Sequence, residues 1–324
     1  MAIKTGIAGQ LMVKAESAYG TPVVVDRTYE FVSEGIDVDV ARVDGMMIGG
    51  GRFLRNDRTK TYIRGARGPV DFIVLNKNFG LLFEHAIGQN TVTGASANKT
   101  HTIIPDANAL QGKSLTLQVG RPDVAGTVQP FTFEGGKITE WELKCAVDGP
   151  LHFVPTFDFE NVVTATALAS PSYVATQEMF IFTEGALTIG GSSVFVKDAS
   201  IKGNNGLNTD RRGLTNTKRE PLAQGIVDYL TGTLACEFEN LTAYAALVAG
   251  TQAQLVLTFT MATVIPTTAA PFSMTVTIPK IQYTGETPKV GGPEVVQQNL
   301  PFRALYDGSN PMITIAIVTS DTSS

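Results

Sequence analysis

One local pattern occurs twice in the chain and limits what the chain can fold into. A glycine opens a run of β-favouring residues, and an asparagine eight positions later precedes an apolar stripe with helical spacing. The first copy has Gly68 and Asn76, and the second has Gly232 and Asn240, an offset of 164 positions. An internal repeat of this kind indicates a structural unit that is built more than once. The pattern therefore predicts two copies of one fold unit in tandem.

A second offset, of 143 positions, aligns the later part of each copy without a gap. The aligned pairs are Lys137-Ile138 with Lys280-Ile281, Gly149-Pro150 with Gly292-Pro293, and Phe159 with Phe302. A longer loop between helix and next strand in the first copy, Gln89 to Gln111, accounts for the change of offset. We therefore expect two domains, residues 1–165 and 166–324, joined by the small-residue segment near 163–172.

Most of the chain favours β-structure, with helical periodicity in two places. The clearest β-rich runs of strand length are 70–75, 114–119, 255–260 and 312–317. The first helical stripe consists of Phe79, Leu82, Phe83, Ala86 and Ile87, and the second of Leu241, Tyr244, Ala245 and Val248. Asn76 and Asn240 are expected to cap these helices, which Gly88 and Gly250 would end. The fold class is mainly β, with one flanking helix and one long loop in each unit.

The two long loops carry basic charge in a chain whose formal net charge is −5. Seven basic and two acidic residues lie in Arg42–Arg67, and five basic and two acidic in Lys202–Glu220, so the loops hold +8 and the remainder −13. The basic candidates for contact with an acidic partner surface are Arg52, Arg55, Arg58, Lys60, Arg64, Arg67, Arg211, Arg212, Lys218 and Arg219. Simple solubility is the alternative role for these charges, because solvated loops are commonly charged.

Acidic residues alternate with apolar ones in several predicted strands. Asp37 and Asp39 alternate with apolar residues, and Glu237 and Glu239 lie opposite Cys236 in the same way. Since successive side chains of a strand point to opposite faces, each pair shares one face. Asp71 occupies an outward position in its own strand. These five acidic residues form either an ordinary solvated sheet face or an acidic concave surface.

The sequence offers little support for an enzyme. The three histidines, His85, His101 and His152, belong to no metal-ligand motif, and Cys145 and Cys236 form no CxxC pair. Gly49-Gly50-Gly51 lacks the Lys-Ser/Thr of a phosphate-binding loop, and we interpret it as a hairpin tip. Glu140 and Glu142 fit a solvated strand face better than a glycosidase pair. We predict no catalytic, cofactor or metal site, and a chain made in the cytoplasm without signal peptide or membrane anchor.

Short motifs spread in order along nearly the whole chain resemble those of a known family. The motifs are Gly9-Gln10, 16–22, 31–34, the Arg-rich first loop, 80–85, 112–116, 119–122, 210–212, 242–244, 285–288 and 291–294. Together they resemble the major tail tube proteins of long-tailed, siphovirus-like bacteriophages. The short glycine-rich tip at 46–51 departs from that pattern.

The resemblance implies tandem tail-tube-like β-sandwich or half-barrel domains and a structural role in the virion. Such subunits form stacked rings around a channel that conducts genomic DNA, usually with six domains per ring. Two units per chain favour a trimeric, pseudo-sixfold ring over a hexamer. On this view Asp37, Asp39, Asp71, Glu237 and Glu239 line the channel, and the basic loops contact the next ring.

The same resemblance implies further partners and leaves rival functions open. A tape measure protein and a tail terminator are the expected partners, DNA passes without specific binding, and the location is the virion tail after assembly in the host cytoplasm. The alternatives are another tail component, such as a tail terminator or baseplate hub, and a nucleic-acid-binding module that uses the basic loops.

Overall fold

A computed structural model describes residues 3–48, 51–95, 97–106, 110–285 and 287–323. These residues are mainly β, with two α-helices and four short 3-10 helices. The first half contains β1 (Gln10–Ala15), β2 (Arg27–Tyr29), β3 (Ser33–Glu34), β4 (Asp37–Asp44), β5 (Thr59–Ile73), α1 (Gly80–Ile87), β6 (Gly88–Thr93), β7 (Lys99–Pro105), β8 (Leu115–Pro122), β9 (Val128–Ala146), β10 (His152–Phe159) and β11 (Asn161–Val163). The mainly β fold class is therefore confirmed.

The second half contains fewer strands and one helix. They are β12 (Gly185–Ile189), β13 (Ser192–Ser193), β14 (Val196–Asn204), β15 (Leu230–Glu237), α2 (Thr242–Ala249), β16 (Ala253–Val264), β17 (Pro271–Tyr283), β18 (Gln297–Ala304) and β19 (Thr314–Thr319). Neither described α-helix, at eight residues each, has the length and apolar character that crossing a bilayer requires.

Both halves pair their strands antiparallel and in the same order. In the first half β4, β5, β10, β9, β8 and β1 are successive neighbours. In the second half β14, β15, β18, β17, β16 and β12 follow in the corresponding positions. Along the chain, α1 comes after β5 and before β8, and α2 comes after β15 and before β16, so each helix separates the second and fifth strands of its series. The division at residues 165 and 166 stays a prediction, because the halves also share strands.

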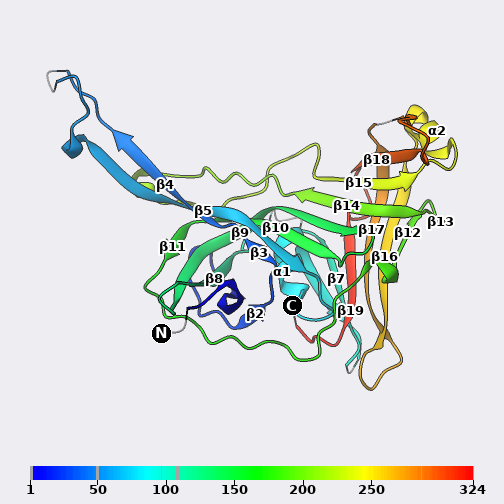
Figure 1. Cartoon of the computed structure of the whole chain (residues 1–324), viewed down its shortest axis with the longest axis horizontal. Coiled ribbons are helices and arrows are strands. Elements are labelled where there is room, and N and C mark those ends of the chain that lie inside the picture. Colours follow the sequence, from blue (N-terminus) through cyan, green and yellow to red (C-terminus); the bar gives the residue numbers. More distant parts are fainter. Residues whose placement is uncertain (1–2, 49–50, 96, 107–109, 286, 324) are drawn as a thin grey trace.

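Two strand pairings join the halves, in addition to the isolated bridges of Leu75 with Met179 and Pro150 with Ile181. The C-terminal part of β9 pairs with β14, from Glu140 opposite Asn204 to Ala146 opposite Asp198. The hairpin of β6 and β7 extends the other half's sheet through β7 and β19, with Ile103 opposite Ile315. Figure 1 shows the strands of both halves side by side across the middle of the molecule. Backbone groups at these strand edges are hydrogen-bonded instead of exposed.

The core is richest in aromatic residues beneath α1. Phe72 lies opposite Phe153 across β5 and β10, and the ring of Phe83 packs on Phe153 with centroids 4.6 Å apart. Seven of the eight α1 residues are buried, whereas α2 buries none. Each fully buried phenylalanine contributes roughly 1.5–3 kcal/mol through the hydrophobic effect. The first half therefore holds α1 much more tightly than the second half holds α2.

The helices form where the apolar stripes predict them, with different caps. α1 begins at Gly80, and the buried side chain of Asn76 accepts a hydrogen bond from the Glu178 amide instead of capping the helix. The side chain of Asn240 accepts the amide hydrogen bond of Thr242 at the start of α2. Gly250 ends α2 in the left-handed conformation, at φ +64°, which glycine adopts without strain. Asn76 as an N-cap was wrong, because its amide joins segments far apart in sequence.

Two segments expected to be loops contain hairpins. Most of Arg42–Arg67 lies in β4 and β5, which pair as far as Asp44 and Thr59. This projecting hairpin, residues 42–67, is called the arm below; Figure 1 shows it extending from the end of the molecule opposite α2. The segment 89–111 forms most of β6 and β7. Alternating Thr, Val and Ile residues favour strands in both cases, and the polar composition concealed them.

Candidate functional site

The candidate acidic residues lie mainly on one face of the sheet that crosses both halves. Asp71 stands between the buried Val70 and Phe72 on β5 and therefore points away from the core. Asp37 is opposite Arg67 on the same outward side, and Asp39 follows two positions later. Glu237 points outward on β15, next to the buried Cys236. Four of the five residues thus share the polar face opposite the core, which we call the polar sheet face.

Glu239 does not share that face. β15 ends at Glu237, and Glu239 is exposed in the turn before α2, on the wall of a pocket beside that helix. The expectation that Glu237 and Glu239 alternate along one strand fails because the strand ends first.

Basic partners balance several acidic residues on the polar sheet face. Asp39 lies 3.2 Å from the Arg64 guanidinium, and Glu237 lies 2.7 Å from the Lys197 amine. Asp71 is 2.7 Å from Nδ1 of His152. The face thus carries mixed charge, with local ion pairs instead of a uniform acidic field.

Three further acidic residues lie on this face that the sequence did not single out as wall candidates. Glu140 and Glu142 point outward from β9, and Asp198 points outward from β14, directly across from Ala146. Lys202 lies 3.4 Å from Glu142, and Ser200 donates a 2.6 Å hydrogen bond to it. The alternation of Glu140 and Glu142 signalled a strand face. The pairing of β9 with β14 joins that face to the second half. The sequences of these two strands do not indicate that they pair.

The first basic group lies along the arm and is exposed. Arg55 forms an ion pair of 2.8 Å with Asp57, and the Arg52 guanidinium lies 4.7 Å from the ring centre of Phe53. Arg58 and Lys60 are exposed near the end of the arm, and Arg64 and Arg67 are exposed closer to its base. Exposed apolar residues accompany these charges: Met46, Met47, Ile48, Phe53 and Leu54.

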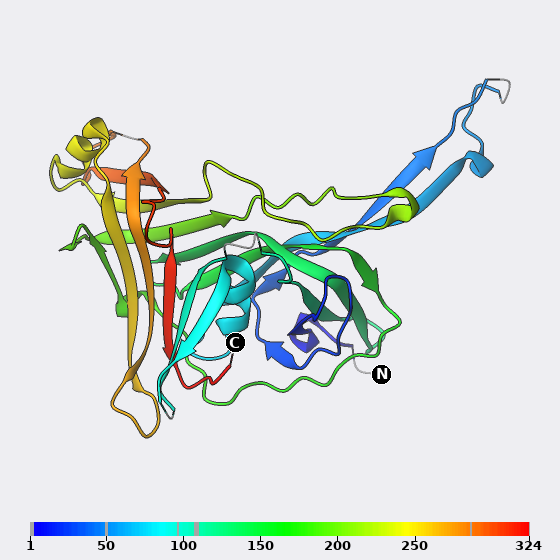
Figure 2. The same cartoon turned by 180° about the vertical axis from the view of Figure 1, so that it is seen from behind.

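The second basic group folds back onto the first half of the same chain. The Lys218 amine is buried, 2.5 Å from the Asp158 carboxylate, and also donates to the Phe159 carbonyl. Arg212 donates to the Arg64 carbonyl, and Arg211 donates to the Glu220 carbonyl. Figure 2 shows the segment between β14 and β15 running along the base of the arm. Lys218 therefore contacts its own chain, and Arg219 stays exposed.

A second buried ion pair fastens the end of this segment. The Lys137 amine, on β9, lies 2.6 Å from the Glu220 carboxylate, and its side chain is 1% exposed. Desolvation lowers the pKa of both Lys137 and Lys218, and burial raises the pKa of Asp158 against the opposing effect of Lys218. Asn205 adds hydrogen bonds to the carbonyls of Ala86 and Ile138, each 2.8 Å. The segment between β14 and β15, residues 205–229, is thus held against the first half, and we call it the internal clamp.

The histidines and cysteines occupy structural positions. His85 is buried in α1, with Nδ1 2.9 Å from the Leu81 carbonyl, and burial lowers its pKa to about 4. Nε2 of His101 lies 3.0 Å from the Asp321 carbonyl. Cys145 and Cys236 are free thiols whose pKa burial raises to about 11. Within the described ranges, His, Cys, Asp and Glu form no cluster of three or more that could hold a metal ion.

Comparison with protein families decides the identity of the fold. The family model described as phage tail tube protein matches residues 6–304. The chain belongs to the phage tail tube protein family. The match spans both halves of this tail tube family member, including the arm and the internal clamp. No curated protein matches the chain.

Membership establishes the coarse role of the chain. It is a structural tail tube protein, a component of the virion tail, and its family assembles by self-association into a tube. The family resemblance noted from the sequence motifs is thereby confirmed. The glycine-rich departure at 46–51 falls partly on residues 49–50, which lie outside the described residues.

Proposed function

We propose that copies of this chain form stacked rings whose inner wall is the polar sheet face, and that genomic DNA passes along this wall during ejection. The observation that carries the proposal is the polar, carboxylate-bearing face opposite the aromatic core, continuous from β5 to β15. A duplex that slides past a wall must not bind it, and each phosphate–cation contact would add affinity. Carboxylates of this face that form no ion pair with the described residues, such as those of Glu140 and Asp198, repel the duplex over about 8–10 Å at physiological salt. Asp37, Asp39, Asp71 and Glu237 are the wall residues, together with Glu140, Glu142 and Asp198.

Six-domain rings with this chain need three copies. Each half contributes one strand series of the same order, so three chains supply six series around a pseudo-sixfold ring. Electron microscopy of the purified protein should show long tubes, and mass measurement of isolated rings should give three chains. A ring of six full chains would overturn the trimer, and absence of tubes would favour a terminator or baseplate hub.

The arm is proposed to join successive rings, because it projects from the body with both basic and apolar residues exposed. Reversing Arg52, Arg55 and Arg58 to Glu should leave folded chains that no longer form tubes. Lys4→Glu, an exposed change away from the arm, is the control and should leave polymerisation intact. Normal tubes from the triple variant would refute this role of the arm. The remaining partners, a tape measure protein and a tail terminator, follow from the tube role.

The wall residues are tested by charge reversal in assembled particles. Asp37→Lys with Glu140→Lys should allow tubes to form but slow DNA ejection, because the wall then attracts phosphates. Glu30→Lys with Glu294→Lys, two exposed changes outside the polar sheet face, should eject at the normal rate. Equal rates for both variants would place the channel elsewhere. Filter binding at physiological salt tests the nucleic-acid-binding alternative, which requires micromolar affinity from the unassembled wild-type chain.

A further inference from the structure

The two halves differ most beneath their helices. Under α1, Phe72 and Phe153 face each other across β5 and β10; the pair at the corresponding place in β15 and β18 is Cys236 and Gln298. On their sheet-facing sides, α1 carries the fully buried Leu82 and Phe83, whereas α2 carries Ala243 and Ala246. Small or polar residues thus replace large apolar ones at corresponding positions.

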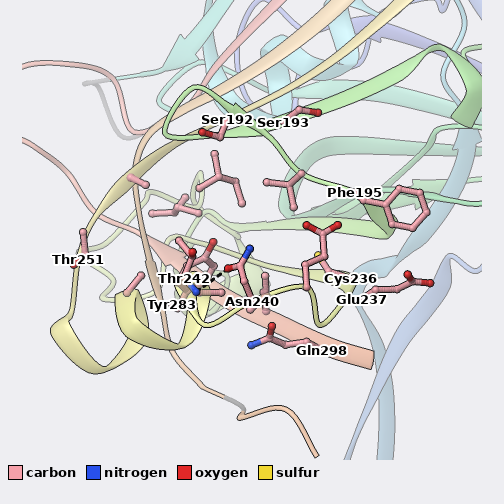
Figure 3. Close-up of a pocket in the computed structure, with 18 residues that line it drawn as sticks. Ser192, Ser193, Phe195, Cys236, Glu237, Asn240, Thr242, Thr251, Tyr283 and Gln298 are labelled. Carbon is pink, nitrogen blue, oxygen red and sulfur yellow. Dashed lines mark hydrogen bonds between the residues drawn. The ribbon is translucent and has the colours of Figure 1, made fainter. Parts of the chain in front are cut away.

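The replacements leave a pocket of about 470 Å³ beside α2. Figure 3 shows Cys236, Gln298 and Tyr283 around this space, with Phe195 at one side and α2 at another. Ala243, Ala246, Ile281 and Leu300 add an apolar lining, and Glu237 and Glu239 add acidic groups. A pocket of this size and apolar character holds several large side chains.

One polar group in the pocket wall lacks a partner. Nε2 of Gln298 is buried and makes no hydrogen bond to any of the residues that the structure describes. Buried amide groups in native proteins are almost always satisfied. Gln298 is therefore an exception, at the place where the first half has the fully packed Phe153.

The first half shows what covers the corresponding place there. The internal clamp passes over the end of α1, where Asn205 bonds the Ala86 carbonyl. The clamp connects β14 to β15, and the arm connects β4 to β5. These are the first two strands of the corresponding series in the two halves. Because the chain's own arm projects from the end opposite α2 (Figure 1), it does not cover α2. The arm of another copy can do so.

The end of the arm matches the pocket in chemistry. Phe53 is 73% exposed and Met46 is 71% exposed, although both are large and apolar. Arg52 and Arg55 flank this apolar end, and the pocket wall carries the exposed carboxylate of Glu239. Apolar side chains that enter an apolar pocket, with opposite charges around them, give both affinity and a defined orientation.

We propose that the pocket beside α2 receives the apolar end of the arm from a second copy of this chain. The proposal rests on the tube function and names the surface that the arm contacts. The contact is heterologous, since the arm and the pocket lie at opposite ends of one chain, and such contacts propagate into rings or filaments.

A disulfide between arm and pocket tests the contact, with Thr251, an exposed residue of the pocket wall, as the site of the second thiol. In a background of Cys145→Ser and Cys236→Ser, which removes both native thiols, Leu54→Cys with Thr251→Cys should give oxidised dimers and higher ladders on non-reducing gels of assembled protein. Leu54→Cys without Thr251→Cys should give no ladder. Val124→Cys with Thr251→Cys, which places an even more exposed thiol on another loop, is the control and should give no ladder.

Filling the pocket gives an independent test. Ala243→Phe restores the residue type found under α1 and should exclude the arm while the folded chain keeps its unfolding temperature. We expect at least a tenfold loss of tube formation, measured by sedimentation. Tubes that form normally with Ala243→Phe, or without the ladder from Leu54→Cys with Thr251→Cys, would overturn the arm–pocket contact and leave the tube function standing. That ladder in the absence of tubes would support the contact and overturn the tube function.

Discussion

The buried amine of Lys218 meets the carboxylate of Asp158 at 2.5 Å and pins a segment of the second half onto β10 of the first. Breaking a buried ion pair from one side leaves an uncompensated charge, which costs about 3–5 kcal/mol. Lys218→Met should therefore lower the free energy of unfolding by about that amount in urea titration. Lys218→Met combined with Asp158→Asn should recover part of the loss, because no charge is then stranded.

The matched control for this pair is the exposed ion pair of Lys14 and Asp26. Lys14→Met should cost less than about 1 kcal/mol, as is usual for pairs in high dielectric. Equal losses for the two lysine variants would contradict the internal clamp as a stabilising contact.

His85 should make the chain less stable in mild acid. Its pKa is lowered from 6.5 to about 4 in the folded state, chiefly by burial. As the pH falls from 6.5 to 4, the unfolded chain takes up a proton that the folded chain excludes, so stability falls across that window. The loss at pH 4 amounts to about 3 kcal/mol at about 1.36 kcal/mol per pKa unit. In urea unfolding at pH 7 and pH 4.5, His85→Gln should lose clearly less stability between the two conditions than wild type; equal losses would exclude His85 as the cause.

The junction of β9 and β14 should be sensitive to one methyl group. Gly203 lies opposite Trp141, and a Cβ at Gly203 would lie 2.2 Å from Cε2 of the buried indole. Gly203→Ala should therefore cost about 1–3 kcal/mol through overpacking. Gly225→Ala, where no atom lies within 4 Å of the added Cβ, is the control and should change stability by less than about 0.5 kcal/mol. Thermal unfolding of both variants measures the difference, and equal midpoints would show that β14 does not depend on this close approach.

The acidic residues of β4 should matter little for folding. Asp37 and Asp39 are exposed, and the ion pair between Asp39 and Arg64 is half-exposed at both ends. Asp37→Asn with Asp39→Asn should change the free energy of unfolding by less than about 1 kcal/mol. A larger loss in calorimetry would show that these carboxylates serve the fold instead of the proposed channel wall.

Local periodicity was sufficient to place the main strands and both helices, but the apolar stripe predicted for the second helix lies on the exposed side of α2. The stripe at Phe79, Leu82 and Phe83 became the buried face of α1, and the outward position of Asp71 followed from alternation. Polar composition hid the arm, because Thr and charged residues in a two-stranded hairpin bury little and resemble a loop. Local pattern therefore predicts an element's type best where one face is buried.

The local sequence pattern did not predict which distant strands pair with each other. In the sequence, Lys218 resembles any other basic loop residue. The carboxylate with which it forms a buried ion pair, that of Asp158, is 60 positions away. Nothing in Lys99–Pro105 indicates pairing with Thr314–Thr319, because β-rich runs of similar composition can pair with many others. The acidic residues of β9 joined the candidate wall only when β14 extended their sheet. Such choices depend on the whole arrangement of strands.

The pairing of β7 with β19 has a consequence for the time course of synthesis. β7 ends at Pro105, and its partner ends at Thr319, five residues before the last residue of the chain. At about 5–20 residues per second, the ribosome needs roughly 10–40 s to deliver that partner after β7 has emerged. Throughout that interval one edge of β7 is open to pairing with strands of other nascent chains. Synthesis of β19 supplies the partner that closes this edge, so a chain that already contains β19 no longer presents the open edge of β7 to other copies.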